Sequence, residues 1–182
     1  MEAFLRKYGL VDNLTLRLKT DRQTFARKLA ENVDFGGTDF FSGAFEAWKA
    51  SNKDYVGMVK YKAFTIRKRR TFFQAQGVSM PVVNGTFAED GEDLVIEAEI
   101  RTHTRFFIPA LIFGLAAYLI LMLVFAFSGS VQDSNTLFFI IPVMLLHMSL
   151  MLGLPLLIMK RGVARTKKDL KRDFFYIAHG GT

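Results

Sequence analysis

The sequence predicts an α+β protein: an N-terminal antiparallel sheet with one packed helix, followed by a two-helix transmembrane hairpin and a basic cytoplasmic tail. Three observations predict it. The first hundred residues carry the patterns of a strand, a helix, a loop and then about four strands. Two later stretches (106–129 and 134–159) contain no Asp, Glu, Lys or Arg, and seven Lys or Arg residues follow Met159. We therefore divide the chain into residues 1–104, 105–159 and 160–182.

The first two elements are a strand and a helix. Residues 13–19 (NLTLRLK) alternate leucine with polar residues, which is typical of a half-buried strand. In the segment TDRQTFARKLAENV that follows, Thr20 and Gln23 have the spacing of a capping box. Apolar residues then recur on one helical face. We expect a helix from about Asp21 to Asn32 that packs one side against the sheet.

Residues 34–53 interrupt this pattern. Glycine, serine and asparagine are interleaved with aromatic residues, among them Phe41 and Trp48. This composition predicts a loop with a short helix near 44–50. Its aromatic side chains either cover the domain core or lie at the level of lipid headgroups, where Trp is favoured.

A meander of four strands follows the loop. Residues 55–60 and 63–68 predict two strands joined by a tight turn. Residues 80–88 and 94–101 predict a hairpin with its turn at Asp90-Gly91. With the first strand, these segments predict an antiparallel sheet whose apolar face is covered by the helix.

The uncharged stretches predict two membrane spans, at about 106–128 and 137–159. Each has about 23 residues, or roughly 34 Å of helix, against a hydrocarbon layer of about 30 Å. Two buried helices in a soluble core are the alternative, but core helices seldom lack charge on every face.

The distribution of basic residues predicts the orientation. Arg101 and Arg105 precede the first span and Lys160 and Arg161 follow the second, whereas the link SGSVQDSNT has neither Lys nor Arg. Basic residues flank spans on the cytoplasmic side. We therefore expect both termini in the cytoplasm. The N-terminus lacks the apolar region of a signal peptide, which fits a bacterial inner (plasma) membrane.

The segment RTKKDLKRDFFYIAH predicts a basic helix after the second span. Leu170, Phe174 and Ile177 share one face of this helix. Such a helix either lies along the membrane surface or docks on the N-terminal domain, and the sequence leaves both open.

One histidine, His147, lies near the middle of the second span. Counted from the link, Tyr118 of the first span lies at about the same depth, within roughly 1.5 Å. A polar group in hydrocarbon needs a partner. We expect an interhelical hydrogen bond between Tyr118 and His147 that sets the hairpin register. Contact with another membrane subunit is an alternative, and a haem held by His147 and its counterpart in a second copy is another.

The remaining residues do not predict an active site. The chain has no cysteine and three scattered histidines, so no metal site or other cofactor is expected. Glu97 and Glu99 share one face of a strand, which is typical of a solvated face. The run Arg67, Lys68, Arg69 and Arg70 fits contact with anionic lipid headgroups or an acidic partner. Nucleic acid is not expected, because basic residues beside a membrane serve topology and lipid contact.

The runs YVGMVKYKAFTIRKRRTFF, PVVNGTF and LVIEAEIRTH, ahead of an apolar span, carry a resemblance. The chain resembles, over residues 12–125, an uncharacterised family of small bacterial membrane proteins with a β-rich cytoplasmic domain and two following transmembrane helices. Gly57 and Gly85 are the glycines of the shared pattern. The aromatic loop, residues 35–48, is longer than the resemblance implies. No activity is attached to the family, so the resemblance implies no catalytic residue.

These observations predict a non-catalytic integral membrane protein, an accessory or scaffold subunit that binds another membrane protein or a second copy. Its predicted lipid or partner contacts are Phe41, Trp48, Arg67, Lys68, Arg69, Arg70, Lys160 and Arg161. The alternative is a membrane-bound lipid-handling protein or enzyme with a site near the aromatic loop 35–48 and the basic run 67–70.

Overall fold

The computed structural model describes residues 2–38, 51–69, 81–102, 104–127 and 134–180. The chain forms two compact units. One, the sheet unit, contains residues 1–103 and 158–182; the other, the helical unit, contains residues 104–157. The segment 160–182, which the sequence predicts to be a separate tail, is grouped with the sheet unit.

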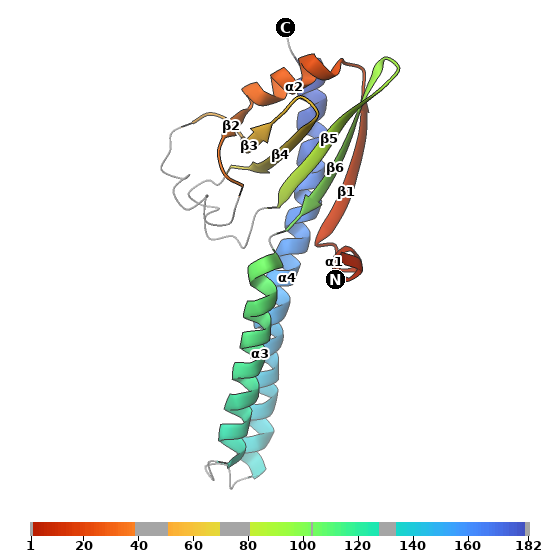
Figure 1. Ribbon diagram of the computed structural model, residues 1–182. Helices are drawn as coiled ribbons and strands as arrows, with labels where there is room; N and C mark the ends of the chain where they lie inside the picture. Colours follow the sequence, from red (N-terminus) through yellow and green to blue (C-terminus); the bar gives the residue numbers. More distant parts are fainter. Residues whose placement is uncertain (1, 39–50, 70–80, 103, 128–133, 181–182) are drawn as a thin grey trace. The chain divides into compact units, whose positions relative to one another are not determined.

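The sheet unit is built on a mixed sheet of six strands (Figure 1). The strands are β1 (Val11–Leu18), β2 (Val33–Phe35), β3 (Tyr55–Val59), β4 (Ala63–Lys68), β5 (Val82–Asp90) and β6 (Asp93–Arg101). They lie in the order β1-β6-β5-β4-β3-β2.

The α+β class is confirmed, but the prediction of an antiparallel sheet is wrong at one edge. The other neighbouring strands are antiparallel, whereas β2 runs parallel to β3. Strand β2 has only three residues, which is too short to show alternation. Because β2 and β3 are parallel, the chain must return to the starting end of the sheet between them before β3 begins.

Two helices of the sheet unit come from the N-terminal part of the chain, α1 (Glu2–Lys7) and α2 (Arg22–Glu31). The carboxylate of Asp21 caps α2 by accepting a hydrogen bond from the backbone N–H of Thr24 at 2.8 Å. This bond lowers the pKa of the Asp21 carboxyl. The N-cap is therefore Asp21, one residue after the Thr20 that the capping-box spacing predicted.

The C-terminal part of the long helix α4 (Ser134–His179) also covers the sheet (Figure 1). Its side chains Met159, Val163, Leu170 and Phe174 are buried, three of them in the same core as the sheet and α2. Of the two positions that the sequence left open for this helix, the structure shows docking on the N-terminal domain. The predicted apolar face is confirmed, with Ile177 partly buried against the core.

Phenylalanine rings fill the centre of this core. The ring of Phe174 meets those of Phe25 and Phe64 edge to face, with centroids 5.5 Å and 5.6 Å away. Phe64 in turn stacks on Phe87 at 5.1 Å. Its ring lies over Gly85 of the neighbouring strand, where a Cβ atom would come within 2.3 Å. Glycine at this position lets the aromatic ring lie flat against the sheet.

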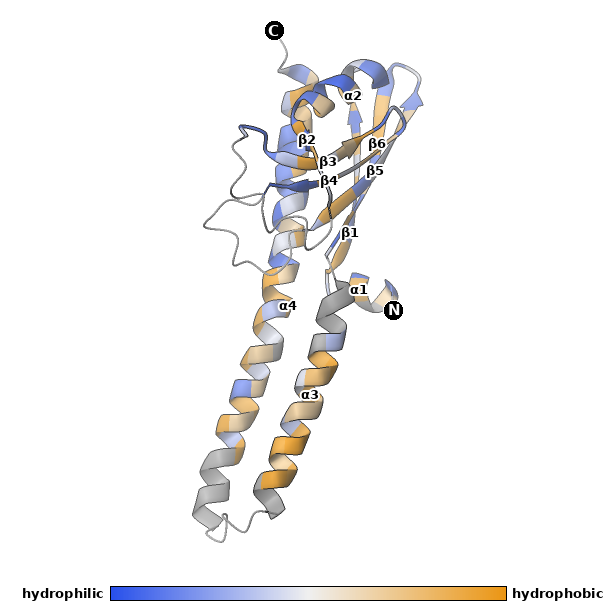
Figure 2. Ribbon diagram, turned by 60° about the vertical axis from the view of Figure 1, so that its left-hand side comes forward, coloured by the Kyte–Doolittle hydropathy of each residue, from blue (hydrophilic) through white to orange (hydrophobic). Residues whose placement is uncertain are grey.

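The helical unit contains α3 (Thr104–Phe127) and the first part of α4, which lie beside each other in both views (Figures 1 and 2). Helix α3 covers most of the first predicted span, whereas α4 includes the second and continues to His179, well beyond the predicted end at 159. Of the residues that the structure describes, one helical stretch, Ile141–His179, is long and apolar enough to cross a membrane. The apolar part of α3, Leu111–Val124, is shorter than that criterion.

Replacing Phe174 by alanine tests the docking of α4. Phe174 is 0% exposed, so Phe174→Ala removes a fully buried ring and should lower the free energy of unfolding by about 3–5 kcal/mol. Phe175→Ala is the matched control, because the ring of Phe175 is the next in the chain and is 54% exposed. Urea titrations of the full chain in detergent, followed by circular dichroism, measure both. Equal effects would contradict the docking.

Candidate functional site

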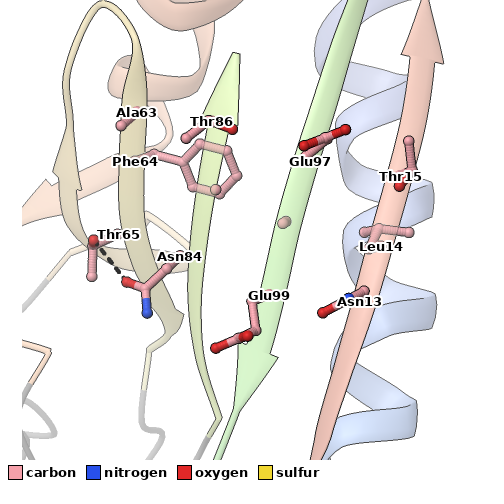
Figure 3. A pocket seen from close by; sticks show the side chains of 12 residues that line it. Asn13, Leu14, Thr15, Ala63, Phe64, Thr65, Asn84, Thr86, Glu97 and Glu99 are labelled. Atoms are coloured by element: carbon pink, nitrogen blue, oxygen red, sulfur yellow. Dashed lines mark hydrogen bonds between the residues drawn. The ribbon is translucent and has the colours of Figure 1, made fainter. Parts of the chain in front are cut away.

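One face of the sheet carries polar side chains, while α2 and the C-terminal part of α4 pack on the other. We call this polar surface the open face. Because the register aligns four strands, its side chains form two rows across β1, β6, β5 and β4. The first row is Asn13, Glu99, Asn84 and Thr65, and the second is Thr15, Glu97, Thr86 and Ala63 (Figure 3).

The open face is hollowed along these rows. The hollow has a volume of about 550 Å³ and is lined by the eight residues of the rows together with Leu14, Phe64, Gly85 and Ala98. Gly85 and Ala98 are paired across β5 and β6 and lie between the rows. Both positions face the core, where Ala98 is buried and a Cβ atom at Gly85 would meet the Phe64 ring, so backbone atoms form the shallow floor between the polar rows. The shape and polarity suit a broad polar contact rather than an enclosed ligand.

Charges on the open face are balanced at one end. The carboxylate of Glu99 accepts hydrogen bonds from Arg6 at 3.3 Å and from Arg101 at 3.0 Å. Arg101 also donates to Glu2 at 2.7 Å, and this hydrogen bond is the main cause of the raised pKa of the Arg101 guanidinium. In the first row, the Thr65 hydroxyl donates to Oδ1 of Asn84 at 2.9 Å (Figure 3). Glu97 is exposed near the middle of the face.

The chemistry of the open face is that of hydrogen bonding. Glu97 and Glu99 are the paired carboxylates noted in the sequence, and the structure surrounds them with amide and hydroxyl side chains. The described part of the chain contains no group of three or more His, Asp or Glu residues placed to hold a metal ion. The two rows present hydrogen-bond donors and acceptors at regular positions on the sheet.

The described cations of the basic run face into the sheet unit. Arg67 is 1% exposed and donates to the carbonyl of Gly37 at 3.3 Å, so it offers no surface to a lipid headgroup. Lys68 pairs with Asp169 of α4 at 2.8 Å, and Arg69 pairs with Asp34. The pKa of Asp34 is lowered, first by a hydrogen bond from Ser51 and also by Arg69. These cations hold elements of the unit together.

The other predicted contact residues divide into two groups. Lys160 and Arg161 are exposed on α4, where they follow the buried Met159. Phe41, Trp48 and Arg70 lie outside the residues that the structure describes. The predicted aromatic loop therefore stays a prediction.

Polar contacts between α4 and the sheet were not anticipated from the sequence. The hydroxyl of Tyr55 donates to Asp173 at 2.6 Å, and Lys167 reaches Asp12 at 2.8 Å. Burial is the main cause of the raised pKa of the Tyr55 hydroxyl, which the neighbouring Asp173 raises further. Asp169 and Asp173 lie one helical turn apart, beside the buried Leu170 and Phe174. That spacing is the one sequence signal from which contacts of Asp169 and Asp173 with the sheet could have been predicted.

In the helical unit the structure brings Tyr118 and His147 together. The Tyr118 hydroxyl contacts Nδ1 of His147, and the two ring centroids are 5.8 Å apart. The hydroxyl donates when the ring proton is on the other nitrogen, Nε2. A groove of about 390 Å³ lies at this level, lined by Ala117, Tyr118, Leu121, Val143, Met144 and His147. The pair is thus the polar part of an otherwise apolar groove.

Gly114 lies one helical turn before Tyr118 in α3. A Cβ atom built there would have nothing within 4 Å, and the same holds for Gly153 of α4. The two glycines therefore border open space instead of a close helix crossing.

Comparison of the chain with protein families, with curated proteins and with solved structures finds no significant match. The resemblance to a membrane-protein family therefore stays an expectation.

A double-mutant cycle tests the polar pair of the helical unit. Tyr118→Phe and His147→Leu should each weaken helix association, with a coupling energy of about 0.6–1 kcal/mol, as for hydrogen bonds between membrane helices. SDS-driven unfolding of the full chain in mixed micelles measures the four variants. Tyr176→Phe, at an exposed tyrosine of the same protein, is the control. Fully additive effects would contradict a hydrogen bond between the two side chains.

Proposed function

We propose that the chain is a non-catalytic integral membrane protein of the bacterial inner (plasma) membrane. The helical unit spans the bilayer as a hairpin and the sheet unit lies in the cytoplasm. The protein acts as an accessory or scaffold subunit that uses its open face to bind another membrane protein.

The observation that carries this proposal is the apolar surface of the helical unit. Leu119, Ile120 and Leu121 of α3 are 63%, 62% and 48% exposed. Successive helical residues point about 100° apart, so these three side chains present apolar surface over more than half of the helix circumference. Exposed large apolar side chains of α4 are Ile141, Val143, Leu145, Leu146, Leu150, Met151, Leu154 and Leu157. Figure 2 shows this concentration as orange ribbon.

Exposing an apolar surface of this extent to water is unfavourable, whereas membrane-spanning helices normally present such a surface to lipid. A helix that is apolar on every side is suited to a hydrocarbon environment. With 24 residues, α3 is about 36 Å long, which suffices for a bilayer core of about 30 Å. Basic residues flank the apolar helical segment on the same side, Arg101 and Arg105 at its start and Lys160 and Arg161 after it, which supports cytoplasmic termini.

Support for a protein partner comes from the open face. It is broad, shallow and lined by paired rows of amide, hydroxyl and carboxylate groups, which suits a polar protein surface. A lipid-handling site between residues 35–48 and 67–70 is the weaker proposal, because Lys68 and Arg69 are engaged in ion pairs within the unit.

Cysteine accessibility tests the membrane topology, since the chain has no cysteine of its own. In spheroplasts, Ser130→Cys in the link between the helices should react with a membrane-impermeant maleimide. Thr86→Cys on the open face should react only after lysis. Equal labelling of the two variants before lysis, or release of the protein from membranes by alkaline carbonate, would contradict the proposal.

A pair of matched variants tests the partner. Protein purified in mild detergent from its own membranes should carry a second polypeptide in fixed ratio, measured by native mass spectrometry. Thr86→Arg places a long cation in the open face and should remove that polypeptide. Gln23→Arg adds the same charge at an exposed position of α2, and this variant should retain the second polypeptide. A wild-type chain free of any second polypeptide would rule out the subunit role.

A further inference from the structure

Among the strands that the structure describes, β1 forms one edge of the sheet and pairs with β6 alone. Strand β1 has eight residues and pairs with β6 along its whole length. The opposite edge is formed by β2, which has only three residues. An edge strand of this length presents a row of backbone groups that another strand can pair with.

The register shows which backbone groups of β1 point outward. The backbone N–H of Thr102 donates to the carbonyl of Leu10 at 3.2 Å. Alternate residues of an antiparallel pair exchange hydrogen bonds, so even-numbered residues of β1 bond β6 and odd-numbered residues direct their backbone groups away from it. The outward residues of the exposed part of β1 are Asn13, Thr15 and Arg17.

Only the first of these outward N–H groups has a partner within the described residues. The carboxylate of Asp12 accepts from the N–H of Asn13 at 2.7 Å, which agrees with an outward direction for Asn13. For Thr15 and Arg17, the described part of the chain supplies the outward N–H groups with no hydrogen-bond partner.

We propose that a second copy of this chain pairs with this edge, β1 against β1 in antiparallel orientation, with the two-fold axis at Thr15. This register sets Asn13 of each copy opposite Arg17 of the other, where amide and guanidinium groups are compatible. Leu16, which is only partly buried on the core side, then faces Leu14 of the second copy. Moving the axis to Arg17 would oppose two like charges, which is unfavourable.

The chemistry of β1 favours a copy of itself as the occupant. A strand added here must place apolar side chains beside Leu14 and Leu16 and polar side chains beside Asn13 and Thr15. The sequence NLTLRL of β1 has that alternation. Pairing joins the two sheets into one and continues the polar rows across the axis. It does not depend on the membrane or on the proposed partner of the open face.

Cross-linking of single-cysteine variants in native membranes tests the pairing. A short bis-maleimide should convert Thr15→Cys into a product of twice the chain mass. Thr86→Cys is the matched control: it is exposed on the same face (Figure 3) but two strands away from the edge. The product should be at least tenfold scarcer for Thr86→Cys. Comparable yields from both positions, or no dimeric product from Thr15→Cys, would overturn the proposal.

A proline variant supplies a second readout. Thr15→Pro removes an outward N–H that makes no bond within the sheet, so it should block pairing and leave the fold intact. Native mass spectrometry should show monomer for Thr15→Pro and dimer for Thr15→Ala, with equal circular dichroism spectra. A folded Thr15→Pro dimer would overturn the proposal. If that variant fails to fold, the Thr15→Cys yield decides. Thr86→Arg should lose the open-face partner and keep this dimer. The proposed subunit role and the proposed pairing of β1 can therefore be contradicted independently.

Discussion

The packing of the C-terminal part of α4 on the sheet is the constraint on which the sheet unit depends. A sheet with one apolar face must bury that face against another layer. Helix α2 has ten residues and covers only part of it. Leu170 and Phe174 of α4 close the rest and complete a cluster of aromatic rings with Phe25 and Phe64. Most of the stabilisation comes from this apolar contact.

Polar contacts set where along the sheet α4 rests. Three of its side chains reach three different strands: Lys167 meets Asp12 of β1, Asp169 meets Lys68 of β4, and Asp173 meets Tyr55 of β3. Partly exposed ion pairs add little stability. Their value here is positional, because each contact ties α4 to a different strand and the three together favour one position of the helix along the sheet. Apolar packing alone would tolerate several positions.

The sequence predicted those elements of the fold whose residues repeat with the period of a strand or a helix. Strands β3 to β6 and helix α2 were predicted within a few residues, because alternation and capping are encoded in neighbouring side chains. Strand β2 was missed because three residues carry no period. The docking of α4 stayed open because an amphipathic face looks the same whether it meets lipid or a sheet. Glu97 and Glu99 gained their neighbours Thr86 and Asn84 only through strand register, which one strand's sequence does not contain.

The two-segment construction of the sheet unit has a consequence for biosynthesis. Tyr55 and Asp173 are separated by 118 positions in the chain, and all of the helical unit is translated between them. The sheet leaves the ribosome with part of its apolar face uncovered, and its cover arrives after both apolar helices have been made. Until then the nascent domain exposes surface that aggregates or recruits chaperones. Completion of the fold thus reports that translation has passed the last turns of α4.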